Sequence, residues 1–379
     1  MRVGYSATIW DERRSGIGIY IAEQLAVFAK IPEIEVEPIE YGGRILPRGE
    51  MPRASGTSQG VSNKMRPLRD ILWHRRTLAG VARDRRWQLV HIPTIRRLPS
   101  DLPCPWTVTV HDLGPLRIPG KYGALRHLYH SKIVPRWLAQ AAAIITPSEA
   151  TKKDLAEIHR IDPARVTVVL NGINHALYKP GNREQSAANL AKRGIRRPFF
   201  LYISRLEHPA KNHARLLEAF DLFKKSTGAP HRLVLVGAPW NGHDVIHAAH
   251  QRMKFKDEVT FTGYVEPQAL PDYLRACEAL VYPSLFEGFG LPVLEAMACG
   301  TPVACSRSSS LTEIAEGRAL LFDPYEPGDI ASALATLSKD VRLREKFSAE
   351  GIPYVSSFTW ERSARETLEV WSKVVEASK

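Results

Sequence analysis

The sequence predicts an α/β protein built from two Rossmann-like, doubly wound domains. Three observations carry this prediction. The chain has 379 residues, which is long for a single core and about right for two α/β domains. Short apolar runs rich in β-branched residues alternate with longer amphipathic stretches, as in parallel sheets covered by helices. The alternation occurs in two similar series, which predicts one sheet for each series.

Each series contains six candidate strands. The first series consists of Arg2–Ile9, Ile34–Ile39, Gln88–Ile92, Trp106–Val110, Ala143–Thr146 and Val166–Leu170. The second series consists of Phe199–Ser204, Arg232–Gly237, Val259–Gly263, Ala279–Pro283, Pro302–Ser306 and Ala319–Phe322. Amphipathic segments between the strands supply the crossover helices that parallel pairing requires.

A polar stretch separates the two series. Residues 178–198 have little apolar periodicity, and Pro180, Gly181 and Asn182 give them turn chemistry, so we place the hinge there. The first domain is predicted to span residues 1–178 and the second residues 179–358. A last helix is predicted over about 359–379, and its periodicity leaves open which domain it packs on.

Composition excludes several other classes of protein. The chain has no run of about 18 apolar residues and no charged start followed by an apolar signal core, so neither a membrane span nor a secretory signal is expected. Its four cysteines form no CxxC pair, which argues against a structural zinc site and a disulfide framework. A cytoplasmic localisation is expected.

The positive charge is concentrated in one segment. The formal net charge is +12, and residues 41–100 hold thirteen Lys or Arg against three acids, an excess of +10. Such a segment is either a solvated face or a surface for an anionic partner, such as lipid, nucleic acid or a phosphorylated acceptor. Within it, residues 65–81 carry an apolar strip beside the cations, formed by Ile71, Leu72, Leu78 and Val81. The strip is either core or the face of a helix that attaches the protein peripherally to the inner face of a membrane.

The densest motif is the segment Phe286–Gly300, which follows a predicted strand and opens a helix. Gly288 and Gly290 let the backbone approach a ligand closely, and the N–H groups of a helix start attract a pyrophosphate. Two acids frame this site, Glu287 in the loop and Glu295 in the helix. A carboxylate accepts hydrogen bonds from vicinal hydroxyls, so one acid can hold a transferred sugar and the other a ribose. For Glu295 alone, a simple complement to the helix dipole is an equally open interpretation.

A second motif, Ser204–Asn212, follows the first strand of the second series. Arg205 and Lys211 then stand at the carboxyl end of a strand, where ligands of open α/β sheets bind. Two such cations can neutralise a diphosphate leaving group, although either could be a solvated surface charge. The chain has no Asp-x-Asp pair, the usual carboxylate clamp for a divalent ion on a nucleotide-sugar. Neither a metal ion nor a cofactor is therefore expected.

The first series carries weaker signals. Gly16 and Gly18 form a turn between the first strand and the first helix, but a third glycine is missing, which disfavours a dinucleotide-binding enzyme. His111 and Asp112 close the strand Trp106–Val110, where the histidine is either reactive or a structural residue.

With these residues in place, the chain resembles the retaining glycosyltransferases of family four, which have the GT-B fold. The resemblance covers nearly the whole chain. It rests on the Glu287–Glu295 segment, the two cations after the first strand of the second series, the glycine turn, the His111-Asp112 pair and Asn171–Ile173. It implies two Rossmann-like domains that face each other across a cleft holding the active site, and a final helix that crosses back to the first domain.

The resemblance also implies which residues form the site. It gives catalytic roles to His111, beside the donor sugar and the acceptor, and to Glu287, on the hydroxyls of the donor sugar. It implies binding of the nucleotide-sugar donor by Gly16, Gly18, Arg205, Lys211, Tyr264, Val265, Gly288, Phe289, Gly290, Leu291 and Glu295.

Each part of the donor is assigned in this way. Arg205 and Lys211 would bind the diphosphate, helped by backbone N–H groups of 288–291 and of the glycine turn. Glu295 would bind the ribose, and the backbone of Tyr264 and Val265 would clamp the nucleobase. The family transfers with retention, commonly explained by same-face attack in which the leaving phosphate accepts the proton of the acceptor.

Two stretches, His111–Pro115 and Ser204–Asn212, are most similar to bacterial mannosyltransferases of surface-polysaccharide assembly. GDP-mannose is therefore the favoured donor, with UDP-glucose, UDP-N-acetylglucosamine and a deoxysugar donor open, and a saccharide or lipid-linked saccharide is the expected acceptor.

Two other functions compete with glycosyl transfer. One is a nucleotide-sugar epimerase of the same fold, which would take no acceptor. The other is a non-catalytic module that binds nucleic acid through the basic segment. Only Trp73 and Trp87 interleave those cations, so stacking platforms are not evident and no nucleic acid partner is expected.

Overall fold

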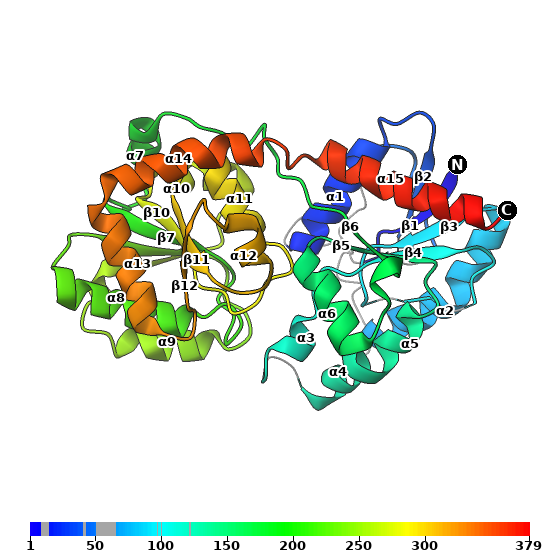
Figure 1. Ribbon diagram of the computed structural model, residues 1–379, viewed down its shortest axis with the longest axis horizontal. Coiled ribbons are helices and arrows are strands. Elements are labelled where there is room, and N and C mark those ends of the chain that lie inside the picture. Colours follow the sequence, from blue (N-terminus) through cyan, green and yellow to red (C-terminus); the bar gives the residue numbers. More distant parts are fainter. Residues whose placement is uncertain (9–14, 41–42, 51–65, 97, 100, 121–122) are drawn as a thin grey trace. The chain divides into compact units, whose positions relative to one another are not determined.

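The computed structural model describes residues 1–8, 15–40, 43–50, 66–96, 98–99, 101–120 and 123–379, with residues 66–71 and 75 described by their backbone alone. The chain divides into two compact units, each built on its own sheet (Figure 1). The first unit comprises Met1–Leu116, Ala124–Gly172 and Phe358–Lys379. The second comprises Arg117–Gly123 and Ile173–Ser357, so the division at 172/173 lies six residues before the predicted boundary at 178.

The first unit contains a parallel sheet of six strands in the order β2-β1-β3-β4-β5-β6. Its strands are β1 (Arg2–Ser6), β2 (Glu35–Ile39), β3 (Leu89–Ile92), β4 (Trp106–Thr109), β5 (Ala143–Thr146) and β6 (Val166–Val168). The helices between them are α1 (Gly16–Phe28), α2 (Arg66–Asp84), α3 (Gly114–Arg117), α4 (Ala124–Leu128), η1 (Tyr129–Ile133), α5 (Val134–Leu138), α6 (Glu149–His159) and η2 (Pro163–Arg165). The strand order reverses direction between β1 and β3.

The second unit repeats this plan with a parallel sheet in the order β12-β11-β10-β7-β8-β9. Its strands are β7 (Phe199–Ile203), β8 (Arg232–Val236), β9 (Val259–Gly263), β10 (Ala279–Tyr282), β11 (Val303–Ser306) and β12 (Leu320–Phe322). Its helices are α7 (Arg183–Ala191), α8 (His213–Thr227), α9 (His243–Gln251), η3 (Lys256–Glu258), η4 (Pro267–Ala269), α10 (Leu270–Ala276), α11 (Leu291–Ala298), α12 (Ser309–Ala315), α13 (Pro327–Lys339) and α14 (Val341–Val355). Here the order reverses between β10 and β7.

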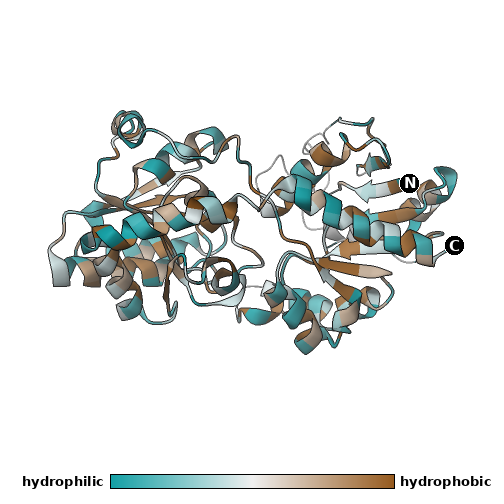
Figure 2. Ribbon diagram, turned by 45° about the horizontal axis from the view of Figure 1, so that its top comes forward, coloured by the Kyte–Doolittle hydropathy of each residue, from teal (hydrophilic) through white to brown (hydrophobic). Residues whose placement is uncertain are grey.

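The prediction of two doubly wound α/β sheets is confirmed, and all twelve predicted strands are present. Figure 2 shows apolar residues concentrated on the strands and polar residues on the outer faces of the helices. This distribution follows from parallel pairing, because helices cover both faces of each sheet and leave its strands buried.

The last helix, α15 (Trp360–Ala377), packs on the first sheet beside α1. Trp371 is fully buried in a cluster with Tyr5 and Phe28, and its indole Nε1 donates to His91 Nδ1 at 3.3 Å. The first residue of this helix packs directly against Gly172, where a Cβ atom would lie only 2.2 Å from the backbone N of residue 360. The end of the chain thus completes the unit that its first strand begins.

The stretch predicted as a hinge is folded. Residues 183–191 form α7, whose N-cap Asn182 accepts from the N–H of Gln185. Ser186 and Asn189 donate to the two carboxylate oxygens of Asp272 in α10, at 2.7 and 2.9 Å. The expectation of a hinge over residues 178–198 was wrong for residues 183–191, where hydrogen bonds to Asp272 and the buried side chain of Leu190 hold a helix in place.

The apolar strip of the basic segment is largely core. Leu78 is fully buried in the first unit, and Val81 packs against the same cluster, so for both residues the core interpretation holds and the membrane-facing one does not. Leu72 is 42% exposed, and the side chain of Ile71 lies outside the described residues. Across the described part of the chain, no helix combines the length and apolarity that a bilayer span needs.

Candidate active site

The two strongest motifs of the sequence meet at the switch point of the second sheet. Strands β10 and β7 are direct neighbours, and the chain leaves them in opposite directions. The loops that follow them, residues 204–212 and 283–290, therefore lie side by side at the carboxyl edge of the sheet. Ligands of open α/β sheets bind in the crevice at such a point.

An ion pair joins these two loops. The Lys211 ammonium lies 2.5 Å from Glu287 Oε1, and both side chains are only 15% exposed. The hydroxyl of Tyr282, the last residue of β10, donates to the same oxygen at 3.1 Å. A cation suited to phosphate and a carboxylate suited to sugar hydroxyls are thus adjacent.

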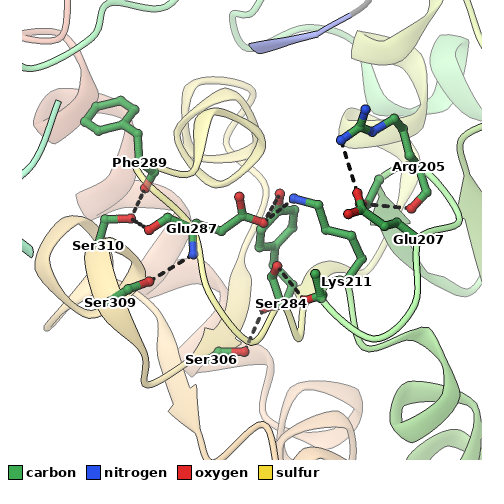
Figure 3. A network of polar contacts seen from close by, with 12 residues as sticks. Arg205, Glu207, Lys211, Ser284, Glu287, Phe289, Ser306, Ser309 and Ser310 are labelled. Atoms are coloured by element: carbon green, nitrogen blue, oxygen red, sulfur yellow. Dashed lines mark hydrogen bonds and ion pairs between the residues drawn. The ribbon is translucent and has the colours of Figure 1, made fainter. Parts of the chain in front are cut away.

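The backbone around Glu287 is held by the start of helix α12 (Figure 3). The Glu287 N–H donates to Ser309 Oγ at 3.0 Å. The Ser310 hydroxyl lies 2.9 Å from the carbonyl oxygens of Glu287 and Phe289. Sequence reasoning missed both serines, although three consecutive serines between a predicted strand and an apolar stretch are a signal for a helix start.

The glycines of this loop fix its path into α11. Gly290 is the N-cap residue with φ +111°, and a Cβ atom there would lie 2.7 Å from Leu311 Cδ2. No other residue type fits this position without strain. Gly288 and Leu291 lie on either side of this turn, so the backbone N–H groups of α11 begin at the crevice, beside the Glu287 side chain.

Glu295 stands on the second turn of α11 and is 8% exposed. Burial raises its pKa to about 7, and a hydrogen bond with Tyr178 partly counteracts this rise. Tyr178 was not singled out in the sequence, because its partner lies more than a hundred residues away.

Arg205 is the second cation of the site, in the loop after β7. Its Nη2 donates to the buried carboxylate of Glu207 at 3.1 Å, as Figure 3 shows. Its guanidinium also lies over the indole ring of Trp240, 4.7 Å from the ring centroid. Trp240 belongs to the loop after β8 and was not predicted.

The predicted nucleobase residues follow β9, at the same edge of the sheet. Val265 is buried, whereas Tyr264 is 55% exposed and its hydroxyl donates to Glu266 at 3.4 Å. Gly263 ends the strand with φ +71°, and its carbonyl accepts from the Gly237 N–H at 2.9 Å.

The other predicted site residues lie in the first unit. His111 follows β4, makes an edge contact with the Tyr20 ring at a centroid distance of 4.8 Å, and has Nε2 2.9 Å from the Pro93 carbonyl oxygen. Because a carbonyl only accepts, Nε2 carries the proton and Nδ1 is left as an acceptor. Burial lowers the His111 pKa to about 4, so the ring is neutral at physiological pH.

The predicted glycine turn forms the N-terminus of helix α1, with Ser15 as its N-cap residue. Gly16 begins α1, and the Gly18 N–H donates to Ser15 Oγ at 3.1 Å. The prediction that this N–H helps to bind a diphosphate is therefore not supported by its geometry, since an N-cap side chain takes it up.

Two doubly wound parallel sheets, with two cations and two acids near the switch point of the second, are the arrangement of a sugar-transferring enzyme of the GT-B fold. Comparison with known proteins agrees. Residues 20–177 match the model "Glycosyltransferase Family 4", and residues 182–352 match the model "Glycosyl transferases group 1". The chain belongs to the glycosyltransferases that combine these two domains, and it is a hexosyltransferase.

Individual relatives extend this result. The chain is 28% identical over 370 residues to O-antigen chain mannosyltransferase B of Escherichia coli, covering 94% of this chain and 96% of that protein. The solved structure of sucrose-phosphate synthase from Thermosynechococcus elongatus has a TM-score of 0.81 at 19% identity and covers all of both chains. HepE of Anabaena in complex with UDP-glucose has a TM-score of 0.72 at 18% identity, covering 98% of this chain and 100% of that chain.

Proposed function

We propose that the protein transfers mannose from GDP-mannose to a saccharide or lipid-linked saccharide acceptor in surface-polysaccharide synthesis, with retention and without a metal ion. The Lys211–Glu287 pair is the observation that carries the proposal. A sugar diphosphate brings a phosphate and sugar hydroxyls together, and this pair offers a cation for the first and a carboxylate for the second, side by side. The mannosyl identity is supported by the O-antigen mannosyltransferase that aligns along nearly the whole chain.

In the proposed reaction, the acceptor oxygen forms a bond to the anomeric carbon on the face from which the phosphate leaves. The bond from that carbon to the phosphate oxygen breaks, and its electron pair goes to the departing diphosphate. The acceptor proton moves to a phosphate oxygen, so no protein nucleophile is needed. Arg205 and Lys211 stabilise the charge that grows on the diphosphate, and Glu287 orients the sugar through its hydroxyls.

Metal independence is proposed because the loop after β7 supplies two side-chain cations, Arg205 and Lys211, that can neutralise a diphosphate. Glu295 would accept from the ribose hydroxyls, and the backbone of Tyr264 and Val265 would hold the base. The neutral His111 ring would accept from a sugar hydroxyl through Nδ1. The resemblance to family-four glycosyltransferases supports these assignments, and so do the hydrogen bonds and burial of these residues described above.

The test begins with thermal stabilisation by GDP, UDP, ADP and TDP, because a bound ligand raises the melting temperature by mass action. GDP is expected to stabilise most. Incubation with GDP-mannose and saccharide acceptors should then give a new glycoside, whose anomeric configuration is determined by NMR. Stabilisation by UDP alone would overturn the donor, inversion would overturn the mechanism, and an isomerised donor without a glycoside would identify an epimerase.

A further inference from the structure

Trp240 is an exposed tryptophan at the carboxyl edge of the second sheet. Its side chain is 48% exposed, in the loop that joins β8 to α9. One face of its indole carries the guanidinium of Arg205, 4.7 Å from the ring centroid. Its place in the fold thus couples it to a residue of the donor site.

The loops after β7 and β8 are joined into one frame. The Ser204 N–H donates to the Val236 carbonyl at 2.9 Å, and the Leu206 N–H donates to the Ala238 carbonyl at 3.0 Å. The Trp240 N–H returns a bond to the Leu206 carbonyl at 3.1 Å. Backbone pairing therefore continues beyond the strands and fixes the two loops relative to each other.

Close packing reinforces this frame. At Gly237, φ is +154°, and a Cβ atom would lie 2.0 Å from the Ser204 carbonyl oxygen. At Gly242, which ends the second loop, a Cβ atom would lie 2.9 Å from His208 Cβ. The indole therefore lies on a loop, the one after β8, whose backbone has little freedom to move away from the loop after β7.

Two contacts restrain the Arg205 guanidinium in different directions. The buried Glu207 carboxylate accepts from Nη2 at 3.1 Å and holds one edge of the group. The Trp240 ring supports one face. A guanidinium has five N–H donors in a rigid fork, which suits phosphate oxygens, and restraint before binding lowers the entropy lost on binding.

We propose that Trp240 is a positioning residue, whose indole holds the Arg205 guanidinium ready for the diphosphate of a nucleotide-sugar. The inference rests on the proposed donor-binding role of Arg205. Trp240 acts through Arg205 and not on the sugar.

A double-mutant cycle tests this inference. Wild type, Trp240→Leu, Arg205→Met and the double variant are titrated with GDP and with UDP, and kcat and KM are measured with the active donor. Trp240→Leu should weaken nucleotide affinity about two- to fivefold, the range expected from loss of an exposed cation–π contact. In the Arg205→Met protein, the same change should have no further effect, whereas a structural role of Trp240 would give an additive loss.

Two controls sharpen the result. Trp240→Phe keeps an aromatic face and should retain most of the affinity. Tyr354→Leu removes a comparable stack in the same unit, where Arg318 lies 3.9 Å from the ring centroid, and should leave affinity unchanged. Melting temperatures verify that every variant is folded.

The possible failures are distinguishable. Additive losses, or a Trp240→Leu protein with wild-type affinity, would overturn the positioning role while Arg205 remains a donor residue. An Arg205→Met protein with unchanged affinity would overturn the diphosphate role of Arg205 and the positioning role with it. Absence of saturable binding of either nucleotide to the wild type would overturn the proposed function itself.

Discussion

Replacing Glu287 by glutamine is expected to stop transfer while leaving the nucleoside diphosphate bound. The substitution keeps the shape of the side chain but removes the negative charge beside Lys211 Nζ, 2.5 Å away. The glutamine oxygen can still accept from the ammonium but carries no charge, and weakening the pairing of a poorly solvated charged donor costs about 1–3 kcal/mol. For domains of this size, that loss corresponds to a fall in melting temperature of about 2–12 °C.

The substitution should affect transfer and nucleotide binding differently. Because the lost carboxylate is assigned to sugar hydroxyls, transfer should fall about 10²- to 10³-fold, as for loss of one group that stabilises a transition state. GDP affinity should stay unchanged or rise, since Lys211 no longer shares its charge with a carboxylate. GDP should therefore raise the melting temperature of the variant at least as much as that of the wild type.

The assay measures glycoside formation and GDP titration on the same preparations. Glu366→Gln, which breaks an exposed ion pair with Arg362 on α15, is the matched control and should change stability by less than about 1 kcal/mol. If the GDP affinity of the Glu287→Gln protein fell by the same factor as its transfer rate, the carboxylate would contribute to nucleotide binding. Its assignment to the sugar hydroxyls would then be wrong.

Four further predictions concern stability, metal and surface. Burial raises the Glu295 pKa to about 7, above its value in the unfolded chain, so the folded state binds an extra proton and stability falls as pH rises from about 5 to about 7. A Glu295→Gln protein should lack this fall, and melting curves at pH 5 and 8 that differ equally for both proteins would contradict the reasoning. Gly290→Ala should destabilise the second unit by about 1–3 kcal/mol, measured by thermal melting, because φ is +111° and the new methyl meets Leu311. A chelator should leave transfer unchanged, and activity restored by a divalent ion would refute metal independence. Sedimentation with vesicles should show binding to anionic lipid that weakens with salt; equal binding to neutral lipid would reject peripheral attachment through the basic segment.

The strands and the meeting of the two strongest motifs could be predicted from the sequence because both depend on local patterns. Most strands are short runs rich in apolar residues that end at a turn, and the carboxyl ends of neighbouring parallel strands share one edge. Arg205, Lys211 and Glu287 could therefore be assigned to one crevice, and the ion pair between the last two fits that assignment.

Residues that act through distant partners were not accessible. Tyr178 is hydrogen-bonded to Glu295, and Trp240 stacks on Arg205. These partners are far apart in the sequence, so the local pattern of apolar and polar residues does not predict the contacts. The helix α7 escaped detection because Leu190 is its only large apolar residue, and hydrogen bonds to Asp272 supply part of its packing. The apolar strip at residues 65–81 could not be assigned to core or membrane from the sequence, because an amphipathic pattern does not show whether its apolar face contacts lipid or a sheet.

The position of α15 has a consequence for how the protein is made. The first unit needs Trp360 and Trp371 to close its core, yet residues 173–357 must leave the ribosome before them. At roughly 5–20 residues per second, that interval lasts about 10–40 seconds. During it, the surface of α1 and the first sheet that later receives α15 is open to solvent and to other nascent chains. The second unit can fold in this time, so the first half of the gene encodes the half of the protein that matures last.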